Sequence, residues 1–521
     1  MPKKESAFNR SLSILAKSSM WVFVGIIISR ILGYAYRIIV ARYYGPEVYG
    51  LLTLSLTIVG WFALFSLLGL DTGVLRHLSF YSAKKHENKT SYIVKFFMSL
   101  LLITGIVAGA LLFIFSDLIA EKIFSNSQLS IFLKLFSLTI PLTSLKAVLF
   151  PLMQVYGKYW WVLFASKILD PLVKVITLVT LIFLGVNSIN VPLSFLLAAI
   201  FVSFFAYLFC RISFKKIFKI KPRKDRRLSK EIISYSWPLL FFALSMFLFH
   251  QEDLLIIGIL KTVKDVGFYS AAVPISLLLV TSISLFSYMF FPVIAQQYSK
   301  GNKKIVKQLS QQTGKWVYML SLPLFILFII FPGVFIKILF GEEYLVATNA
   351  LRFLSIGAMF ANLSGISNQL LSIQGKSKLI LKDTLFVLVL NAILNLILIP
   401  VYGITGAAIA TMISFIFLGL IFAFQSWKLL GIIPLRRKMI NITIVTLIPT
   451  GLLLLIKEII EINLFTLIIL GILFISLYVL LIMFTGCLDK NDKLILDLIK
   501  KKISWKTKSE SSELKKEQED L

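Results

Sequence analysis

Residues 463–487 have the sequence NLFTLIILGILFISLYVLLIMFTGC, which contains no Asp, Glu, Lys or Arg. A helix of about 20 apolar residues is long enough to cross a bilayer core that is about 30 Å thick. Inside that core a helix satisfies all of its backbone hydrogen bonds internally, which an open strand or a loop cannot do. This stretch therefore predicts a membrane-spanning α-helix.

Similar apolar runs recur along the chain and predict about 14 transmembrane helices. The composition agrees, because 58% of the 521 residues are hydrophobic and 15% are charged, whereas soluble domains carry about 25% charged residues. Soluble, disordered and disulfide-rich classes are excluded, and the predicted fold class is an all-α polytopic membrane protein. The predicted spans are residues 15–41, 48–70, 91–116, 129–153, 160–184, 191–210, 234–259, 267–294, 316–339, 347–372, 380–400, 403–427, 438–456 and 463–487.

The distribution of Lys and Arg predicts which ends of these helices face the cytoplasm. With a cytoplasmic N-terminus, the loops on the outer side carry only six of the 54 basic residues, whereas ten lie between residues 211 and 230. We therefore expect a multi-pass protein of the cell membrane with both termini in the cytoplasm. The net charge of +29 then needs no nucleic-acid partner, because the 211–230 loop would rest on anionic membrane lipids.

Three pairs of glycines recur at nearly constant spacing and predict an internal repeat of six spans. A six-helix unit has an even number of helices, so both copies share one orientation and form parallel repeats about an axis near the membrane normal. The pairs are Gly50 with Gly267, 217 residues apart, and Gly157 with Gly375 and Gly185 with Gly403, each 218 residues apart.

The repeat predicts how the chain divides into domains. Each lobe contains six spans, and the two C-terminal spans are an appendage. The predicted domains are an N-lobe with helices 1–6 (1–210), a basic cytoplasmic linker (211–233), a C-lobe with helices 7–12 (234–427), helices 13 and 14 (428–487) and a charged cytoplasmic tail (488–521).

Charges inside the predicted first span mark candidate functional positions, because intramembrane charges are rare and costly. Arg30 and Arg37 are seven residues apart, which places them on one face of a helix, two turns apart. Arg30 lies deeper and is expected to face a polar cavity. For Arg37 the alternative is that its side chain extends to the outer membrane interface.

The fourth and fifth spans also carry charges. Lys167, Asp170 and Lys174 share one face of the fifth span, where Asp170 can neutralise one lysine and leave a net positive stripe. The alternative is a purely structural salt bridge. Lys146 in the fourth span adds to the positive charge of the N-lobe.

The seventh span differs, because it contains a polar cluster that includes His250, Glu252 and Asp253. Asp253 is suited to proton or cation coupling, but a hydrogen bond that packs two helices explains it equally well. Asn391 and Asn395, four residues apart on one helical face, are interpreted first as donors of interhelical hydrogen bonds.

Several stretches of the chain resemble the multidrug/oligosaccharidyl-lipid/polysaccharide exporter superfamily, and within it the polysaccharide transporter (O-antigen flippase-like) branch. The similarity extends over helices 1–12, and the last stretch is its most specific part. The stretches are 41–51, 68–76, 253–258, 266–274, 341–344 and 391–411. In the family these are largely packing and loop motifs, so they identify the fold better than the cargo.

The resemblance implies two bundles around a central cavity that opens alternately to each side. It also implies a cargo of polyprenyl-(pyro)phosphate-linked oligosaccharide, moved to the outer leaflet for synthesis of surface glycans. Fixed cations near the phosphate are then needed, since Arg and Lys are the side chains that bind it. The predicted substrate-binding cations are those of the N-lobe, Arg30, Arg37, Lys146, Lys167 and Lys174. The predicted coupling or polar cluster contains Asp170, His250, Glu252 and Asp253.

Two other functions stay open on the sequence. An ion-coupled multidrug antiporter of the same fold would have a cavity dominated by carboxylates. A membrane-embedded glycosyltransferase or polymerase would need long extramembrane loops or domains. The longest loop predicted between spans, residues 211–233, is too short for such a domain. No catalytic, nucleotide-binding or metal-ligand motif is present, so we expect a transporter rather than an enzyme, with no cofactor or metal. One chain contains both lobes, so we expect a monomer.

Overall fold

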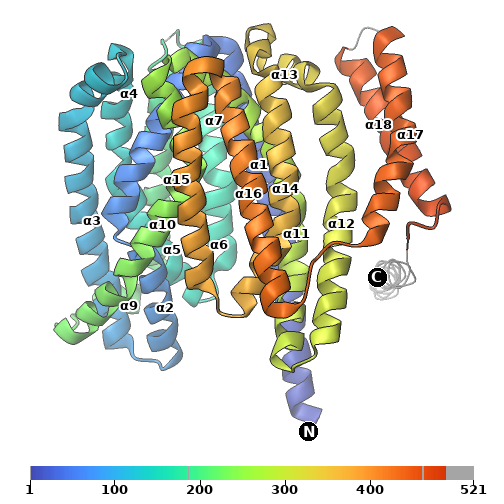
Figure 1. The fold of residues 1–521 in the computed structure, drawn as a ribbon. Coiled ribbons are helices and arrows are strands. Elements are labelled where there is room, and N and C mark those ends of the chain that lie inside the picture. The colour runs from blue at the N-terminus through green and yellow to red at the C-terminus, as the bar shows by residue number, and fades with distance from the viewer. Residues whose placement is uncertain (1, 186, 460–462, 489–521) are drawn as a thin grey trace, which may run out of the picture. The chain divides into compact units, whose positions relative to one another are not determined.

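The computed structural model describes residues 2–185, 187–459 and 463–488. Helices are the only regular elements in these ranges, which confirms the all-α class (Figure 1). Three short segments labelled η are π-helical (η1, η2) or 3-10 helical (η3). The elements before residue 262 are α1 (Pro2–Leu67), α2 (Leu70–Ala83), α3 (Glu87–Leu118), η1 (Ile119–Ile123), α4 (Ser127–Ser137), α5 (Thr139–Val155), α6 (Tyr159–Leu163), η2 (Phe164–Leu169), α7 (Asp170–Phe183), α8 (Asn190–Ser213), α9 (Lys215–Lys219) and α10 (Arg226–Leu260). The later elements are α11 (Val263–Ser299), α12 (Lys303–Ile330), α13 (Pro332–Phe340), η3 (Glu342–Ala347), α14 (Thr348–Ile373), α15 (Ser377–Tyr402), α16 (Ile404–Leu430), α17 (Arg437–Ile459) and α18 (Leu464–Phe484).

Twelve helices in the described part of the chain are long and apolar enough to span a membrane, so the protein is a multi-pass membrane protein. The predicted count of 14 differs for two reasons. First, α1 contains two predicted spans that are joined through one non-helical residue, Gly45 (φ 81°, ψ −179°), which precedes Pro46. Second, residues 159–183, which form α6, η2 and α7, contain three charged residues and are not among the twelve. The count of 14 therefore stays a prediction.

The chain forms two compact units that alternate along the sequence. Unit 1 comprises residues 1–277, 335–358 and 376–418, and unit 2 comprises residues 278–334, 359–375 and 419–521. Helices of both predicted lobes belong to unit 1, and the predicted boundaries of lobes and linker stay predictions. Of the predicted tail, residues 489–521 lie outside the described residues.

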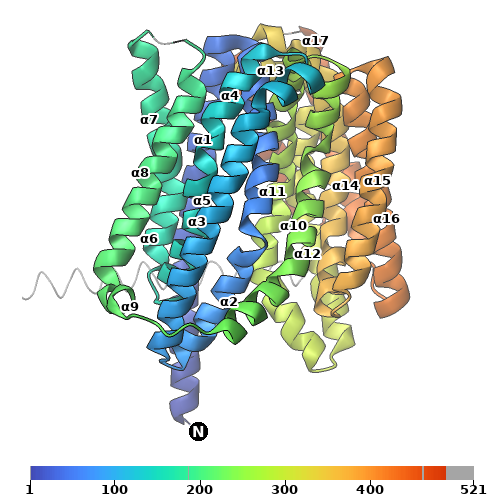
Figure 2. The same cartoon turned by 90° about the vertical axis from the view of Figure 1, so that its left-hand side faces the viewer.

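In unit 1, α3 packs against α4 and α5 at a closeness that only small residues allow. A Cβ atom on Gly105 would lie 2.8 Å from Ser144 Oγ, and one on Gly109 would lie 2.9 Å from the carbonyl oxygen of Ser137. A buried apolar core surrounds this contact and includes Phe97. Figures 1 and 2 show the start of α1, the turn between α2 and α3, and α9 at the same end of this unit.

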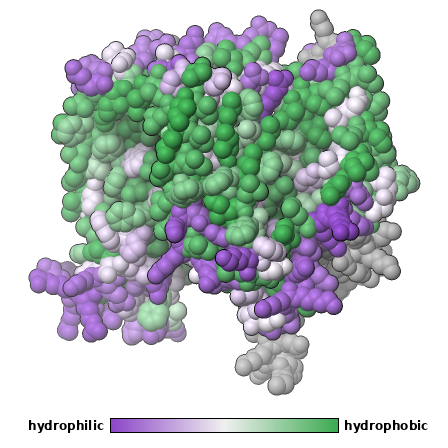
Figure 3. All heavy atoms as spheres, in the orientation of Figure 1, coloured by the Kyte–Doolittle hydropathy of each residue, from purple (hydrophilic) through white to green (hydrophobic). Residues whose placement is uncertain are grey.

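The basic segment after α8 is partly helical, and the next long helix begins earlier than predicted. α10 starts at Arg226 rather than at residue 234 because Asp225 caps it: the Asp225 carboxylate accepts a hydrogen bond of 3.0 Å from the Leu228 backbone N–H. A carboxylate at this position satisfies a free backbone donor and opposes the helix dipole. Hydrophilic residues gather over α9 in Figure 3, whereas the middle lengths of α3, α10 and α15 are apolar.

The second arm of α1 crosses α11 without intervening side chains. A Cβ atom on Gly50 would lie 1.9 Å from the carbonyl oxygen of Val263, and one on Gly267 would lie 1.9 Å from that of Pro46. One turn farther along, Ser270 Oγ donates a hydrogen bond of 3.0 Å to Thr53 Oγ1. The two glycines are one of the pairs that define the predicted repeat.

Arg42, at the end of the first arm of α1, connects this helix to α13, close to the crossing of α1 and α11. Its guanidinium donates hydrogen bonds to the carbonyl oxygens of Lys337, Ile338 and Leu339 at the end of α13. A cation at a helix C-terminus binds the carbonyls that have no intrahelical partner. The Tyr344 hydroxyl in η3 adds a hydrogen bond of 3.2 Å to the carbonyl oxygen of Ala41.

Unit 2 contains α12, α17 and α18, which pack on one another. The Tyr478 hydroxyl donates a hydrogen bond of 2.7 Å to the carbonyl oxygen of Met319, and Lys457 Nζ donates one of 3.2 Å to that of Ile330. α18 begins with a reciprocal capping box, in which Asn463 and Thr466 each accept a hydrogen bond from the other's backbone N–H. The apolar stretch that predicted a spanning helix forms this helix.

Candidate functional site

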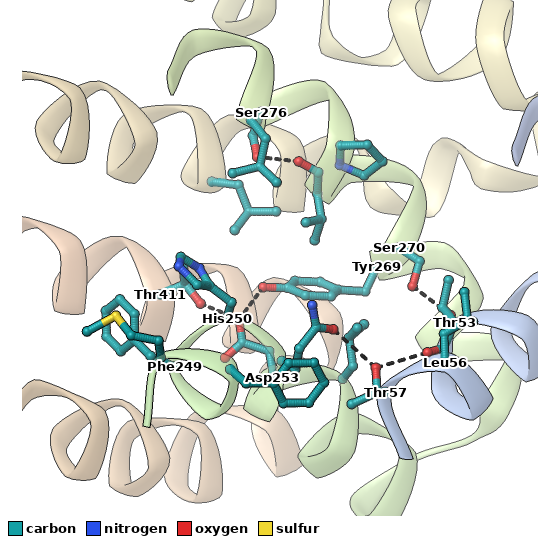
Figure 4. Close-up of a pocket in the computed structure, with 18 of the residues that line it drawn as sticks. Thr53, Leu56, Thr57, Phe249, His250, Asp253, Tyr269, Ser270, Ser276 and Thr411 are labelled. Carbon is teal, nitrogen blue, oxygen red and sulfur yellow. Dashed lines mark hydrogen bonds between the residues drawn. The ribbon is translucent and has the colours of Figure 1, made fainter. Parts of the chain in front are cut away.

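A cavity of about 720 Å³ lies inside unit 1, between α1, α10, α11, α14 and α16. This volume falls in the range of about 300–1,000 Å³ that is common for sites that bind small molecules. Its lining combines apolar rings with polar side chains from four helices, α1, α10, α11 and α16 (Figure 4). The polar and charged lining residues are Arg37, Thr53, Thr57, His250, Gln251, Asp253, Tyr269, Ser270, Ser276 and Thr411.

Asp253 on α10 is the centre of a hydrogen-bond network that joins three other helices. Its carboxylate accepts hydrogen bonds from the Tyr269 hydroxyl on α11 (2.6 Å), from the Thr411 hydroxyl on α16 and from Asn395 Nδ2 on α15 (2.7 Å). Asn391 Nδ2 makes a longer contact of 3.5 Å. Hydrogen bonds to a carboxylate are stronger than those between neutral groups, so this network ties the four helices together around one negative charge.

One oxygen in the network has no hydrogen-bond donor. Asn395 Nδ2 also donates to Asn391 Oδ1 (2.9 Å), whereas Asn395 Oδ1 is buried and has no partner among the described residues. Carboxylate, amide and hydroxyl oxygens are the ligands that hard cations prefer. If Asp253 is protonated, these same oxygens can accept a hydrogen bond from its carboxyl O–H. The arrangement can therefore bind either a proton or a small cation.

The polar cluster of the seventh span divides between two faces of α10. His250 and Gln251 line the cavity beside Asp253, and the Thr57 hydroxyl lies 3.1 Å from Gln251 Oε1. Glu252 does not belong to the lining and is 6% exposed, with Oε1 lacking a partner in the described part of the chain. Successive residues on a helix are rotated by about 100°, which separates Glu252 from its neighbours.

Arg37 is the predicted substrate-binding cation that lines this cavity. Arg30 is exposed and lies on the same face of α1, together with Tyr34 between the two arginines. The Tyr34 hydroxyl donates a hydrogen bond of 2.5 Å to the carbonyl oxygen of Pro274, a residue of the cavity wall. Tyr34 and Arg37 therefore border the cavity, whereas Arg30 does not belong to its lining, and its position facing the cavity stays a prediction.

The remaining predicted cations form a second group around Asp170. Lys174 Nζ lies 2.6 Å from Asp170 Oδ2, and both side chains are one-fifth exposed. The Lys174 ammonium also lies 4.3 Å from the centre of the Phe195 ring, which is a cation–π contact. Lys146 on α5 interacts electrostatically with both members of the pair. The group thus contains one carboxylate and at least two ammonium groups.

Lys167 sits on a π-helical segment, η2, directly before this pair. A Cβ atom on Gly25 would lie 3.8 Å from the Cβ atom of Lys167, so the Lys167 side chain begins beside the first arm of α1. π-Helical turns inside α-helices occur frequently at functional sites. Of the two lysines predicted on this face, Lys174 forms the ion pair with Asp170, and Lys167 is not part of that pair.

The sequence did not single out Tyr269 and Thr411, which complete the Asp253 network. Both lie in stretches that carried the family resemblance, 266–274 and 391–411, and that context is the signal that could have found them. Among the described residues no group of three or more His, Cys, Asp or Glu could hold a metal ion.

Comparison with known proteins matches residues 39–349 to the model of a family described as "Polysaccharide biosynthesis protein". The chain is 24% identical to a putative O-antigen transporter of Shigella flexneri, over 76% of this chain and 94% of the relative. It is 23% identical to the lipid II flippase MurJ of Bacillus subtilis, over 78% and 81% of the two chains. The solved structure of lipid II flippase MurJ in an inward closed conformation has a TM-score of 0.70 at 18% identity, and the match covers 92% of this chain and all of that one. These matches confirm the resemblance to the exporter superfamily.

Proposed function

Because the chain belongs to the polysaccharide biosynthesis protein family, we propose that it flips polyprenyl-(pyro)phosphate-linked oligosaccharide across the cell membrane by alternating access. Relatives that are matched over most of their length are named as an O-antigen transporter and a lipid II flippase. The cargo of such proteins carries a polar glycan and a charged phosphate, neither of which crosses hydrocarbon unaided.

The observation that carries the proposal is the polar cavity with Arg37 on one wall. A guanidinium binds phosphate oxygens through two parallel hydrogen bonds, and the hydroxyl and amide groups of the cavity suit the hydroxyl-rich surface of a sugar. Arg30 lies on the same face of α1, so the cargo's phosphate would contact both arginines as it moves along that helix. The group around Asp170, with Lys146, Lys167 and Lys174, supplies further positive charge in the same compact unit.

Coupling to an ion gradient would act through Asp253. If Asp253 binds a proton, the carboxylate loses negative charge and its hydrogen bonds to Tyr269, Asn395 and Thr411 weaken. If it binds a cation, the same donors must turn away. In either case α11, α15 and α16 lose a shared anchor, which is the change that a rocking transporter needs. His250 and Glu252 on α10 are further titratable groups close to this site.

The topology that fits this function has 14 spans in two parallel six-helix repeats around the cavity, with two additional helices. The equivalent glycines support the repeat: φ is 74° at Gly157 and 72° at Gly375, and each is the second residue after the end of a helix. Both termini and the basic linker face the cytoplasm in this arrangement, where the 211–230 segment contacts anionic lipids. The protein acts as a monomer, since one chain supplies both repeats.

Transport of lipid-linked sugar is favoured over the two alternatives. A multidrug antiporter has the same fold, but the curated relatives that match this chain over most of their length and carry a functional name are a glycan transporter and a flippase. A glycosyltransferase or polymerase would need an acceptor site outside the membrane, and the described loops between spanning helices are short.

The test is transport by the purified protein in liposomes that contain a fluorescent polyprenyl diphosphate disaccharide. The fraction of label that a membrane-impermeant quencher reaches reports movement between leaflets. Arg37→Gln should slow movement about 10- to 150-fold, because hydrogen bonds to a charged group contribute about 1.5–3 kcal/mol. Arg37→Lys should retain part of the rate. Arg211→Gln, which removes an exposed charge outside the cavity, is the matched control. Wild-type protein that moves no lipid-linked sugar would refute the proposal.

A further inference from the structure

A second cavity in unit 1 is apolar and has a volume of about 630 Å³. It opens between the second arm of α1, α3 and α10. Its wall contains only hydrocarbon side chains apart from the indole of Trp61. Ile58, Trp61 and Phe65 come from α1, Ala108 and Leu111 from α3, and Ile259 from α10. The cavity suits a hydrocarbon chain and excludes sugar or phosphate, which would lose their hydration there.

The apolar and polar cavities share one wall, made by α1 and α10. Thr57 lines the polar cavity and Ile58 the apolar one; on α10, Leu254 and Leu255 divide in the same way. Neighbouring residues on a helix point about 100° apart. The same two helices therefore present a polar surface to one cavity and an apolar surface to the other.

At one level the shared wall contains two aromatic rings over a glycine. Phe247, which lines the polar cavity, packs edge-on against Trp61, which lines the apolar one, with ring centres 6.2 Å apart. A Cβ atom on Gly60 would lie 2.4 Å from the Phe247 ring, so the ring occupies space that only glycine leaves free.

One further observation points to a functional role for the apolar cavity. Ile119 and Ile123 of the π-helical segment η1 line it. Such segments interrupt a regular helix and occur frequently at functional sites.

We propose that the apolar cavity holds the polyprenyl chain of the cargo while its phosphate and glycan occupy the polar cavity, with the molecule passing between α1 and α10 at the Phe247–Trp61 pair. This inference rests on the proposed function and adds where the lipid chain is bound. It explains why a polar and an apolar cavity of similar volume share a wall made by α1 and α10: an amphipathic molecule has one end for each.

The experiment uses a polyprenyl diphosphate disaccharide that carries a photoreactive diazirine on its isoprenoid chain. Wild-type protein in liposomes is irradiated with this probe, and the labelled residues are mapped by mass spectrometry. Ala108→Phe fills the cavity, since Ala108 lines it and is 8% exposed. Ala110→Phe is the matched control, because Ala110 lies two residues away on α3 and is exposed.

In wild type and Ala110→Phe, the probe should label residues of α1, α3 and α10 that line the apolar cavity. Ala108→Phe should lower both this labelling and transport about tenfold or more, because the ring replaces the hydrocarbon contacts of the chain. Ala108→Leu, a smaller change, should lower both to an intermediate degree, and it supplies the test if the phenylalanine variant does not fold.

The proposal is overturned if folded Ala108→Phe and Ala108→Leu are labelled and transport as wild type does. It is also overturned if a phospholipid with a diazirine on its acyl chain labels the same residues as strongly as the polyprenyl probe does in an equimolar mixture. Failure of the proposed function gives a different result. The wild-type protein then moves no lipid-linked sugar, whichever residues the diazirine on the isoprenoid chain labels.

Discussion

Replacement of the crossing glycines Gly50 and Gly267 by alanine should open the end of the protein that is predicted to face outward. The two residues let the second arm of α1 and α11 touch backbone to backbone. An alanine at position 267 would place its Cβ 1.9 Å from the carbonyl oxygen of Pro46, and one at position 50 would lie equally close to that of Val263. No rotamer relieves this clash, because the Cβ position is fixed by the backbone.

The structure gives the size of the effect. An ordinary carbon–oxygen contact is about 3.3 Å, so the helices must separate by about 1.4 Å at the crossing. Overpacking of this kind costs about 1–3 kcal/mol. The cost applies only to the conformation in which the helices touch, so it shifts the equilibrium toward the separated conformation about 5- to 150-fold.

The assay measures how fast a cysteine in the cavity reacts with a membrane-impermeant maleimide that is added outside intact cells. Ser276, which lines the cavity, is replaced by cysteine after Cys210 and Cys487 have been changed to alanine. Gly267→Ala and Gly50→Ala should each raise the rate by the factor above. Gly33→Ala on α1, where a Cβ meets no atom within 4 Å, should leave it unchanged.

The reasoning fails if Gly267→Ala is folded, transports as wild type does and reacts no faster than Gly33→Ala. The close approach would then not limit opening at this end. Thermal unfolding of each purified variant separates this outcome from general destabilisation, because glycine to alanine at an unstrained helical position normally stabilises a protein by about 0.4–1 kcal/mol.

Three other substitutions test the remaining assignments. A cysteine at Lys224, which is exposed in the basic segment, should react with an impermeant maleimide only from the cytoplasmic side; labelling in intact cells would reverse the predicted orientation. Lys174→Gln should destabilise the protein by about 1.5–3 kcal/mol, because it removes the ammonium group 2.6 Å from the Asp170 carboxylate and with it a hydrogen bond between charged groups, and the double variant with Asp170→Asn should restore the melting temperature. If the double variant also restores transport, the pair is a structural salt bridge; if transport stays lost, Lys174 contacts the cargo. Asp253→Asn should abolish the dependence of transport on an imposed proton or sodium gradient, whereas Thr411→Val, which removes one donor to Asp253, should only weaken it; gradient dependence that survives Asp253→Asn would exclude this residue from coupling.

The membrane class and the helical fold could be predicted because hydropathy is a property of short stretches. Each apolar run carries its own evidence of length and charge. The kink at Gly45 could not be predicted in the same way: the residues on both sides are helical, and only a positive φ at one glycine separates the two arms of α1. The sequence predicted that one span ends and the next begins in this region, but not that a single residue, Gly45, would connect them.

Of the residues around the candidate site, the sequence singled out Arg37, His250 and Asp253 but not Tyr269 and Thr411, and it did not predict which groups pair with Asp253. The spacing of Asn391 and Asn395 correctly places both on one face, but nothing local identifies Asp253, more than 130 residues earlier, as their acceptor. Helical periodicity also does not show which neighbours of Asp253 on α10 face the cavity. Glu252 is turned away from the cavity that His250 and Asp253 line, because the direction of a face depends on which helices pack around it.

The Asp253 network has a consequence for how the protein is made. Tyr269 follows Asp253 by only 16 residues, but Asn391, Asn395 and Thr411 follow it by 138, 142 and 158 residues. At about 5–20 residues per second, a ribosome needs about 7–32 s to add them. During that interval α10 is already in the membrane with an aspartate whose insertion costs about 2.5–3.5 kcal/mol, and the Tyr269 hydroxyl is the one donor of this set that exists. The nascent chain must therefore keep Asp253 near water, or against an assembly factor, until α15 and α16 emerge.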